Sequence, residues 1–407
     1  MSVSEILSPR EKKNIKLLAH WVYRVINLKR KVCSKKQVIC FRKKNAHTFF
    51  GYYDVSPFNS NNQLLYLELN GNHAYADIVL NNIDNTGKMY IGKTYAWNWQ
   101  QGCRLRWLPG SDTEVIFNIY EDNNYGAQII STDGSLIRKL KYPLYDIDPT
   151  GKYGLTLNFE RLGFLRPGYG YTCRKYEEND LENESIQIID LTLDKIIDKI
   201  TYRQIAEKMI KECCLKKYYI NHLSFSPDGT KFLFFWIEIV NTYHKASLMV
   251  YDIETKTIIP LETEEKVSHY VWLNNDEILC TSYKTPNKCR YYIYCISKQS
   301  KISYCPMSLK EDGHPSIYKD GYVITDTYPD KNGYQNIYLV DQKKDSKVQL
   351  IQIYSRPVME GEKRTDLHPR LNQNKTLVCF DSNKNSKREL YILKLNYDKN
   401  SDSYNCI

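Results

Sequence analysis

Four short segments in the second half of the chain repeat one pattern. Each contains a histidine, an apolar residue three positions later, a polar turn and then an apolar strand. The histidines are His222, His269, His314 and His368, at intervals of 45 to 54 residues. A period of this length, carried by paired short strands, is typical of the blades of a β-propeller.

Three weaker copies of the pattern precede these segments. Superposing the turns gives seven units, which start near residues 50, 102, 142, 220, 267, 312 and 366. We therefore predict an all-β protein, a seven-bladed β-propeller over residues 45–397. Within it, the Gly- and charge-rich stretch 163–182 is expected to be a long loop, and 201–218 a helix on a blade rim. Residues 398–407 are polar and are expected to be a frayed tail.

The region before the propeller, residues 1–44, is expected to hold a basic N-terminal amphipathic helix followed by a Lys-rich linker. Within residues 10–31, apolar side chains recur at helical spacing and Lys and Arg fill the remaining positions. Such a helix could lie on an anionic membrane surface with Trp21 at the interface. The alternative is a helix that packs on the propeller or covers its edge.

Charge and composition limit the partners and the location. The net charge of +10 favours an acidic partner, although a Lys-rich surface can also serve solubility alone. No nucleic-acid recognition motif is visible, so no nucleic acid is expected. The sequence contains no long apolar run and no signal-peptide pattern. We expect a cytoplasmic monomer or homo-oligomer, peripheral to the membrane if the helix binds lipid.

The four histidines occupy one repeat position. Tyr52, Arg104 and Leu144 hold this position in the first three units. The first strand of each propeller blade lines the central channel, so equivalent side chains should converge around the axis. A ring of imidazoles can bind a divalent transition metal or supply a general base. The alternative is that each histidine simply bonds to a neighbouring blade.

Charged residues are expected at the same mouth of the channel. The second strand of each blade returns antiparallel to the first, so its end should lie beside the histidines. This placement assigns to the mouth Glu160, Arg161, Glu238, Asp326 and Asp381, with Arg104 and Arg166 adding positive charge. Guanidinium groups pair with carboxylates, which favours an acidic ligand such as a uronate sugar. The alternative for the Asp and Glu residues is turn capping.

An aromatic segment precedes the second unit. Trp97, Trp99 and Gln100 fall in the sequence WNWQQG. Aromatic rings beside a polar mouth are typical of sugar-binding platforms, and the alternative is packing between blades. Trp99 and Gln100 are therefore candidate substrate-binding residues, together with the arginines and with Asp326 and Asp381.

The repeat as a whole resembles TolB-type and WD-repeat-like propellers, most clearly in SFSPDGTKFLFF. The segments NHLSFSPDG, SHYVW, GHPSI and DLHPR resemble oligogalacturonate lyases, whereas the first three blades match only in fold. That resemblance implies a cytoplasmic protein that holds Mn²⁺ mainly by histidines and uses a further histidine as base in β-elimination on a uronate. Carried over, His222 would be the base, and His269, His314 and His368 the metal ligands. The glutamine and second histidine that the family adds around one blade have no counterpart in GHPSI.

We therefore predict an enzyme, a metal-assisted lyase acting on an acidic oligo- or polysaccharide. The segments HTFFGYYDVSPF, WNWQQG and TDLHPR are similar to propellers associated with bacterial surface-polysaccharide genes. Two alternatives stay open. One is a glycoside hydrolase using two carboxylates from Glu160, Glu238, Asp326 and Asp381. The other is a non-catalytic binding module of a glycan assembly complex.

Overall fold

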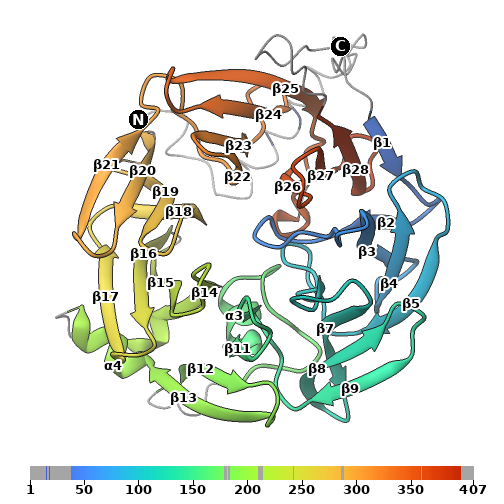
Figure 1. Cartoon of the computed structure of the whole chain (residues 1–407), viewed down its shortest axis with the longest axis horizontal. Coiled ribbons are helices and arrows are strands. Elements are labelled where there is room, and N and C mark those ends of the chain that lie inside the picture. The colour runs from blue at the N-terminus through green and yellow to red at the C-terminus, as the bar shows by residue number, and fades with distance from the viewer. Residues whose placement is uncertain are drawn as a thin grey trace.

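The chain forms seven sheets arranged in a ring around a common axis (Figure 1). The computed structural model describes residues 15, 18, 38–177, 181, 184–209, 214–241, 243–285, 288–358 and 360–395. In these ranges every sheet has four antiparallel strands, and six of the seven use strands that follow one another along the chain. The predicted all-β, seven-bladed propeller is confirmed.

The first three blades span the N-terminal half. The first contains β2 (His47–Phe49), β3 (Gln63–Leu69), β4 (Ala76–Asn82) and β5 (Met89–Thr94). The second contains β6 (Arg106–Trp107), β7 (Glu114–Glu121), β8 (Asn124–Ser131) and β9 (Leu136–Leu140). The third contains β10 (Asp146–Ile147), β11 (Tyr153–Thr156), β12 (Ser185–Asp190) and β13 (Lys195–Thr201).

The remaining blades carry the four histidines. The fourth contains β14 (Tyr218–Phe225), β15 (Lys231–Val240), β16 (Tyr243–Asp252) and β17 (Thr257–Glu262). The fifth contains β18 (Lys266–Trp272), β19 (Glu277–Tyr283), β20 (Cys289–Cys295) and β21 (Ser300–Tyr304). The sixth contains β22 (Ser316–Lys319), β23 (Tyr322–Asp326), β24 (Tyr334–Asp341) and β25 (Ser346–Tyr354), and the seventh contains β26 (Arg370–Leu371), β27 (Leu377–Ser382) and β28 (Glu389–Lys394).

The seventh blade is completed from the other end of the chain. Strand β1 (Val38–Phe41) pairs antiparallel with β28, with Val38 opposite Leu393 and Phe41 opposite Leu390. This strand falls within the segment expected to be a linker, so the sheet system begins earlier than residue 45. Because the closing strand covers the outer edge of the last blade, that edge is not left open for pairing with another chain.

One helix interrupts the third blade, and the other helical segments lie in connections between blades. Helix α3 (Phe159–Leu165) follows β11 and is capped by Asn158, whose side chain accepts hydrogen bonds from the Glu160 and Arg161 amides. Helix α4 (Tyr202–Lys208) begins with a capping box between Thr201 and Gln204, and the 3₁₀ turns η1 (Leu215–Lys217) and η2 (Gly361–Lys363) lie farther along. The structure therefore has shorter helices near 201–218 than expected, and the expected 163–182 loop begins inside α3.

The N-terminal region and the tail give little structural information. Apart from residues 15 and 18, the expected amphipathic helix of residues 10–31 lies outside the described residues, as does the expected tail of residues 398–407. The helix and its membrane contact therefore stay predictions. Among the residues that the structure does describe, no helix has the length and apolar character needed to cross a membrane.

Candidate functional site

The four histidines of the repeat lie together, and their rings contact one another. The ring centroids of His269 and His314 are 3.9 Å apart, and those of His314 and His368 are 4.3 Å apart. His222 lies slightly farther away, 6.5 Å from His269. All four side chains are buried. The repeat register therefore places imidazoles from four consecutive blades next to one another.

The local backbone explains how these side chains reach the axis. In β14 the pairing register with β15 shifts between Asn221 and Ser224, so His222 lies in a β-bulge. Its φ of 59° is in the left-handed region, and His368, just before β26, has a φ of 49°. A bulge changes the direction of a side chain relative to the regular alternation of the strand. Residues other than glycine rarely adopt a positive φ. A bulge within β14 and a left-handed residue just before β26 therefore direct His222 and His368 toward the other histidines.

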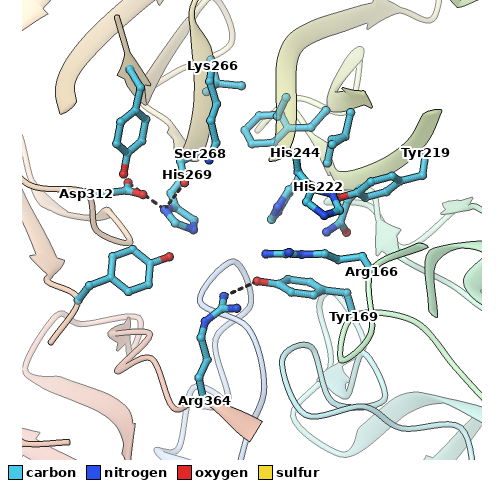
Figure 2. Close-up of a pocket in the computed structure, with 17 residues that line it drawn as sticks. Arg166, Tyr169, Tyr219, His222, His244, Lys266, Ser268, His269, Asp312 and Arg364 are labelled. Carbon is cyan, nitrogen blue, oxygen red and sulfur yellow. Dashed lines mark hydrogen bonds and ion pairs between the residues drawn. The ribbon is translucent and has the colours of Figure 1, made fainter. Parts of the chain in front are cut away.

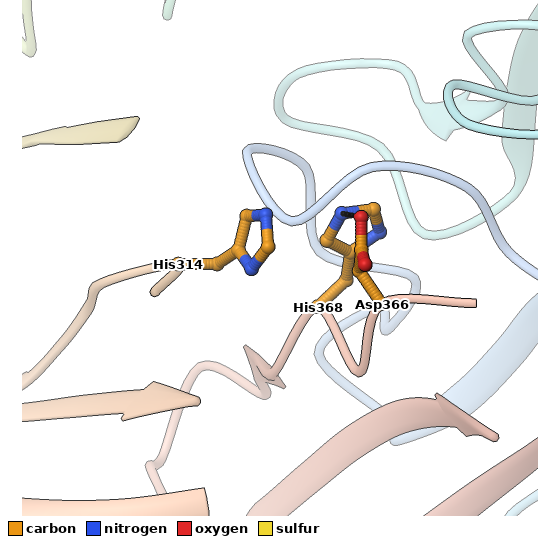
Figure 3. Close-up of side chains that lie close together, drawn as sticks. All are labelled: His314, Asp366 and His368. Carbon is orange, nitrogen blue, oxygen red and sulfur yellow. Dashed lines mark ion pairs between the residues drawn. The ribbon is translucent and has the colours of Figure 1, made fainter. Parts of the chain in front are cut away.

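His314, Asp366 and His368 form a cluster of candidate metal ligands. Each offers one ligand atom, and these atoms lie within 4.8 Å of one another (Figure 3). The Nδ1 atom of His314 bonds to the carboxylate of Asp326 at 2.8 Å, and Nδ1 of His368 bonds to the carbonyl of Gly51 at 2.9 Å. Since both partners can only accept, each Nδ1 carries a proton, and in the neutral ring each Nε2 has a lone pair that a metal can take.

This donor set suits a divalent metal. The Nε2 atoms of His314 and His368 are buried and have no hydrogen-bond partner. Two imidazole nitrogens and one carboxylate oxygen are ligands that first-row divalent ions accept. Asp366 was missed by the sequence reasoning. The spacing of Asp366 and His368 in DLHPR was the available signal, because residues only two positions apart can both contact one ion.

His269 has a different environment from the other predicted metal ligands. Its Nδ1 lies 3.1 Å from the carboxylate of Asp312 and 3.2 Å from the hydroxyl of Ser268. The ring lines an open cavity and also lies against His314. His269 therefore connects the cavity with the cluster of His314, Asp366 and His368.

The cavity itself has a volume of about 390 Å³ and lies on the histidine side of the channel (Figure 2). Three cationic side chains, Arg166, Lys266 and Arg364, line it together with His222, His269 and several tyrosines. Arg364 donates to the Tyr169 hydroxyl at 2.7 Å and to the Asp366 carboxylate at 2.9 Å. The cavity is thus positively charged, and Arg364 connects it to the candidate metal ligands. Lys266 and Arg364 were not predicted from the sequence.

Burial and neighbouring charges shift the pKa values of the histidines and of Asp366. Burial lowers the pKa values of His222 and His368 well below the usual 6.5. Burial also acts to lower the pKa of His314, but the Asp326 carboxylate outweighs it and the pKa is raised. Burial acts to raise the pKa of Asp366, and Arg364 and His314 outweigh it, so the carboxyl stays ionised. At neutral pH the cavity is therefore lined by a neutral His222, and the ionised Asp366 carboxylate lies behind Arg364.

Two arginines predicted to face the ligand do not line this cavity. Arg104 is buried, and its guanidinium binds Asp54 and donates to the Tyr145 carbonyl. Arg161 donates to the backbone carbonyls of Tyr218 and Leu215. The prediction for Arg161 was wrong because β11 ends at Thr156, and α3 then turns the side chain into the protein interior. Arg166, one residue beyond α3, does reach the cavity.

The predicted acidic residues also have structural partners. Asp326 accepts hydrogen bonds from the His314 and His368 amides as well as from the His314 ring. Asp381 pairs with Arg370 and Arg388 at 2.9 and 2.7 Å. Neither lines the cavity, and the same holds for Glu160, which pairs with Arg174, and for Glu238. Asp326 thus orients the histidines instead of contacting a ligand.

Trp99 and Gln100 also lie outside the central cavity. Trp99 is buried and stacks on Phe49, with ring centroids 6.0 Å apart. The Gln100 side chain is fully buried and donates to the carbonyls of Glu362 and Arg364 at 2.7 and 3.0 Å. Gln100 therefore holds the segment that carries Arg364 into the cavity.

Comparison with known proteins gives structural matches alone. No family model and no curated protein sequence matches this chain. An oligogalacturonate lyase in complex with manganese has a TM-score of 0.65 and 13% sequence identity, covering 90% of this chain and 96% of that chain. An oligogalacturonate lyase from Vibrio parahaemolyticus has a TM-score of 0.63 and 12% identity, covering 90% and 98%. The propeller domain of the trilobed protease from Pyrococcus furiosus reaches 0.51 at 11% identity, covering 88% and 99%.

These identities are low, so the matches concern the fold. The chain is a seven-bladed propeller that structurally resembles oligogalacturonate lyases along nearly the whole length of both chains. Propeller domains of peptidases share the architecture as well. Because one fold hosts unrelated functions, the function must be argued from the site.

Proposed function

We propose that this protein is a metal-assisted lyase that cleaves an acidic oligo- or polysaccharide by β-elimination. The observation that carries the proposal is the cluster of His314, Asp366 and His368 beside a cavity lined by cations. Arg166, Lys266 and Arg364 would bind the carboxylates of a uronate chain. The proposed setting remains bacterial surface-polysaccharide metabolism.

The chemistry requires loss of a carbon-bound proton. A divalent ion, with Mn²⁺ as the first candidate, would be held by His314, Asp366 and His368 and would acidify the proton on the ring carbon next to the uronate carboxylate. His222 is neutral because burial lowers its pKa, so it can accept that proton. The electron pair left on this carbon forms the double bond to the neighbouring ring carbon, and the glycosidic carbon–oxygen bond at that neighbour breaks.

The leaving oxygen needs a proton. Tyr328 lines the cavity, and burial raises the pKa of its phenol well above 10. Its hydroxyl is therefore protonated at neutral pH and can act as the acid. The Asp312 carboxylate holds His269 between the cavity and the metal ligands, where His269 can complete the coordination or assist proton transfer.

The test uses uronate oligosaccharides of several kinds and follows the ultraviolet absorbance of the unsaturated product. We expect product with Mn²⁺ present, loss of product on chelation, and a decrease on the order of 100-fold or more in kcat for His222→Ala. His47→Gln, outside the cavity, serves as the histidine control and should keep the wild-type rate. Absence of product from every uronate, with or without metal, would contradict the proposal.

A further inference from the structure

A second pocket, which we call the aromatic pocket, lies next to the central cavity. Its volume is about 320 Å³, and its lining includes His73, Tyr95, Trp97, Trp99, Glu362 and Lys363. The rings lie edge to face, with Trp97 and Trp99 centroids 5.3 Å apart and His73 and Trp99 centroids 5.4 Å apart. None of these residues lines the central cavity.

Two loops separate the aromatic pocket from the central cavity. In the first loop, Arg166 and Tyr169 line the central cavity, whereas Gly168 and Gly170 line the aromatic pocket. In the second, Arg364 lines the central cavity and its neighbours Glu362 and Lys363 line the aromatic pocket. The dividing wall is therefore one loop pair thick.

The loops touch at a glycine. Gly168 has a φ of 93°, and a Cβ added there would lie 2.9 Å from Cβ of Glu362. The Gln100 amide donates to the Gly168 carbonyl at 3.0 Å, and the Gln100 side chain donates to the Glu362 carbonyl. Gln100 thus binds both loops. A ligand that extends from the central cavity across these loops would enter the aromatic pocket.

The chemistry of the aromatic pocket suits a sugar ring. Trp97 is half-buried and Tyr95 is 44% exposed, so both present ring surface to solvent. Glu362 and Lys363 place a carboxylate and an ammonium group in the same lining. A pyranose has an apolar C–H face that packs on an aromatic ring and hydroxyl groups that bond to charged side chains at its edge. Tyr75 contacts Tyr95 at 5.9 Å and is also exposed, so the aromatic surface continues outward.

We propose that the aromatic pocket is a second carbohydrate subsite that holds a pyranose ring of the same glycan whose acidic residue occupies the central cavity. The identity of that glycan rests on the proposed function, but the binding of a sugar at Trp97 does not. A ligand long enough to cross the loop pair contacts both sites, whereas a dimer contacts the central cavity alone. The protein should therefore bind longer oligosaccharides more tightly than short ones.

The experiment measures binding of the full chain to acidic and neutral oligosaccharides, on a glycan array and then by calorimetry with dimers and hexamers of each glycan that binds. Wild type is compared with Trp97→Ala, with Trp97→Phe, which keeps a ring, and with Leu136→Ala, an exposed apolar control on β9. We expect hexamers to bind about tenfold more tightly than dimers in wild type, a difference typical of one stacked ring. Trp97→Ala should abolish that difference and leave dimer binding unchanged.

The controls separate the two proposals. Melting temperatures verify that each variant is folded, and Trp97→Phe should retain most of the length preference. If no uronate gives unsaturated product but hexamer binding still depends on Trp97, the lyase proposal fails and the subsite stands. If wild type and Trp97→Ala bind every glycan equally, or no glycan binds in a Trp97-dependent way, the subsite is overturned.

Discussion

The first three blades and the last four place different side chains at one repeat position. In the last four the position holds imidazoles that converge on the axis, and two of them have an unpartnered Nε2. In the first three it holds Tyr52, Arg104 and Leu144. Tyr52 packs between His222 and His368, with centroids 5.2 and 4.8 Å away, and Leu144 is part of the core.

Arg104 shows most clearly what this difference teaches. Its φ of 53° is close to the 59° of His222, so the two residues share a backbone conformation as well as a repeat position. The guanidinium is nevertheless bound by Asp54 and a carbonyl, whereas His222 lines a cavity. The repeat register therefore determines where a side chain is placed, and the neighbouring loops determine whether it is available for a ligand.

The largest effect is expected from removing Arg104, the residue that has a structural role at the repeat position. Arg104→Ala leaves Asp54 as an uncompensated buried charge, so the free energy of unfolding should fall by about 3–5 kcal/mol. Bound metal per folded molecule should not change, because Arg104 does not touch the candidate ligands. Urea unfolding and elemental analysis measure the two quantities. Arg104→Met combined with Asp54→Leu should recover much of the stability, and loss of metal in Arg104→Ala at unchanged stability would contradict the division.

The next largest effect is expected on metal binding when a histidine of the candidate metal cluster is removed. His314→Ala and His368→Ala should each weaken metal binding by on the order of 100-fold or more, because each removes one of three donor atoms. Elemental analysis and titration with Mn²⁺, Zn²⁺ and Fe²⁺ measure the effect. His244→Ala is the matched control, since His244 lines the cavity but bonds to the Tyr219 hydroxyl. Equal metal content in all three variants would remove the case for this centre.

A smaller effect on metal binding is expected from Asp326, which contacts a candidate ligand but is not one itself. Asp326→Asn keeps an acceptor oxygen but loses the charge that orients and polarises His314. Metal affinity should fall about 10- to 100-fold, as is usual for such supporting residues. Asp381→Asn provides a comparison, because Asp381 is buried with Arg370 and Arg388 instead of a histidine. If Asp326→Asn binds metal like wild type, Asp326 has only a structural role.

The smallest effect concerns a histidine of the first half. His47 accepts a hydrogen bond from the Arg388 amide through Nδ1, and burial lowers its pKa to about 4. Between pH 6.5 and 4 the unfolded chain binds a proton at this residue that the folded chain does not, so stability should decrease as the pH falls through this window. His47→Gln should reduce that decrease, measured by urea unfolding at pH 7 and pH 4.5, without altering metal content. An identical decrease in both proteins would contradict the assignment.

Part of the site could be predicted from the sequence and part could not. The placement of His222, His269, His314 and His368 followed from the repeat, because strand period and blade order are properties of local sequence. Asp326 was predicted to bind a ligand at the mouth, whereas its role as partner of two histidine amides depends on contacts between blades. Asp366 precedes His368 by two residues, as Asp312 precedes His314, so a repeated signal existed for it and was not used. Arg364 lies before the seventh unit, so no periodic pattern identified it.

The sequence by itself determined the number of blades, the order of strands within them and the position of the histidine ring, since each blade is a local hairpin pair whose apolar alternation is visible in the chain. Only the tertiary structure decided that β1 closes the last blade and that α3 turns Arg161 inward while Arg166 reaches the cavity. It also decided which buried charges are already paired. These outcomes depend on residues that are far apart in the chain, such as Val38 and Leu393 or Arg161 and Tyr218. A side chain is available for a ligand only where no neighbouring group already binds it.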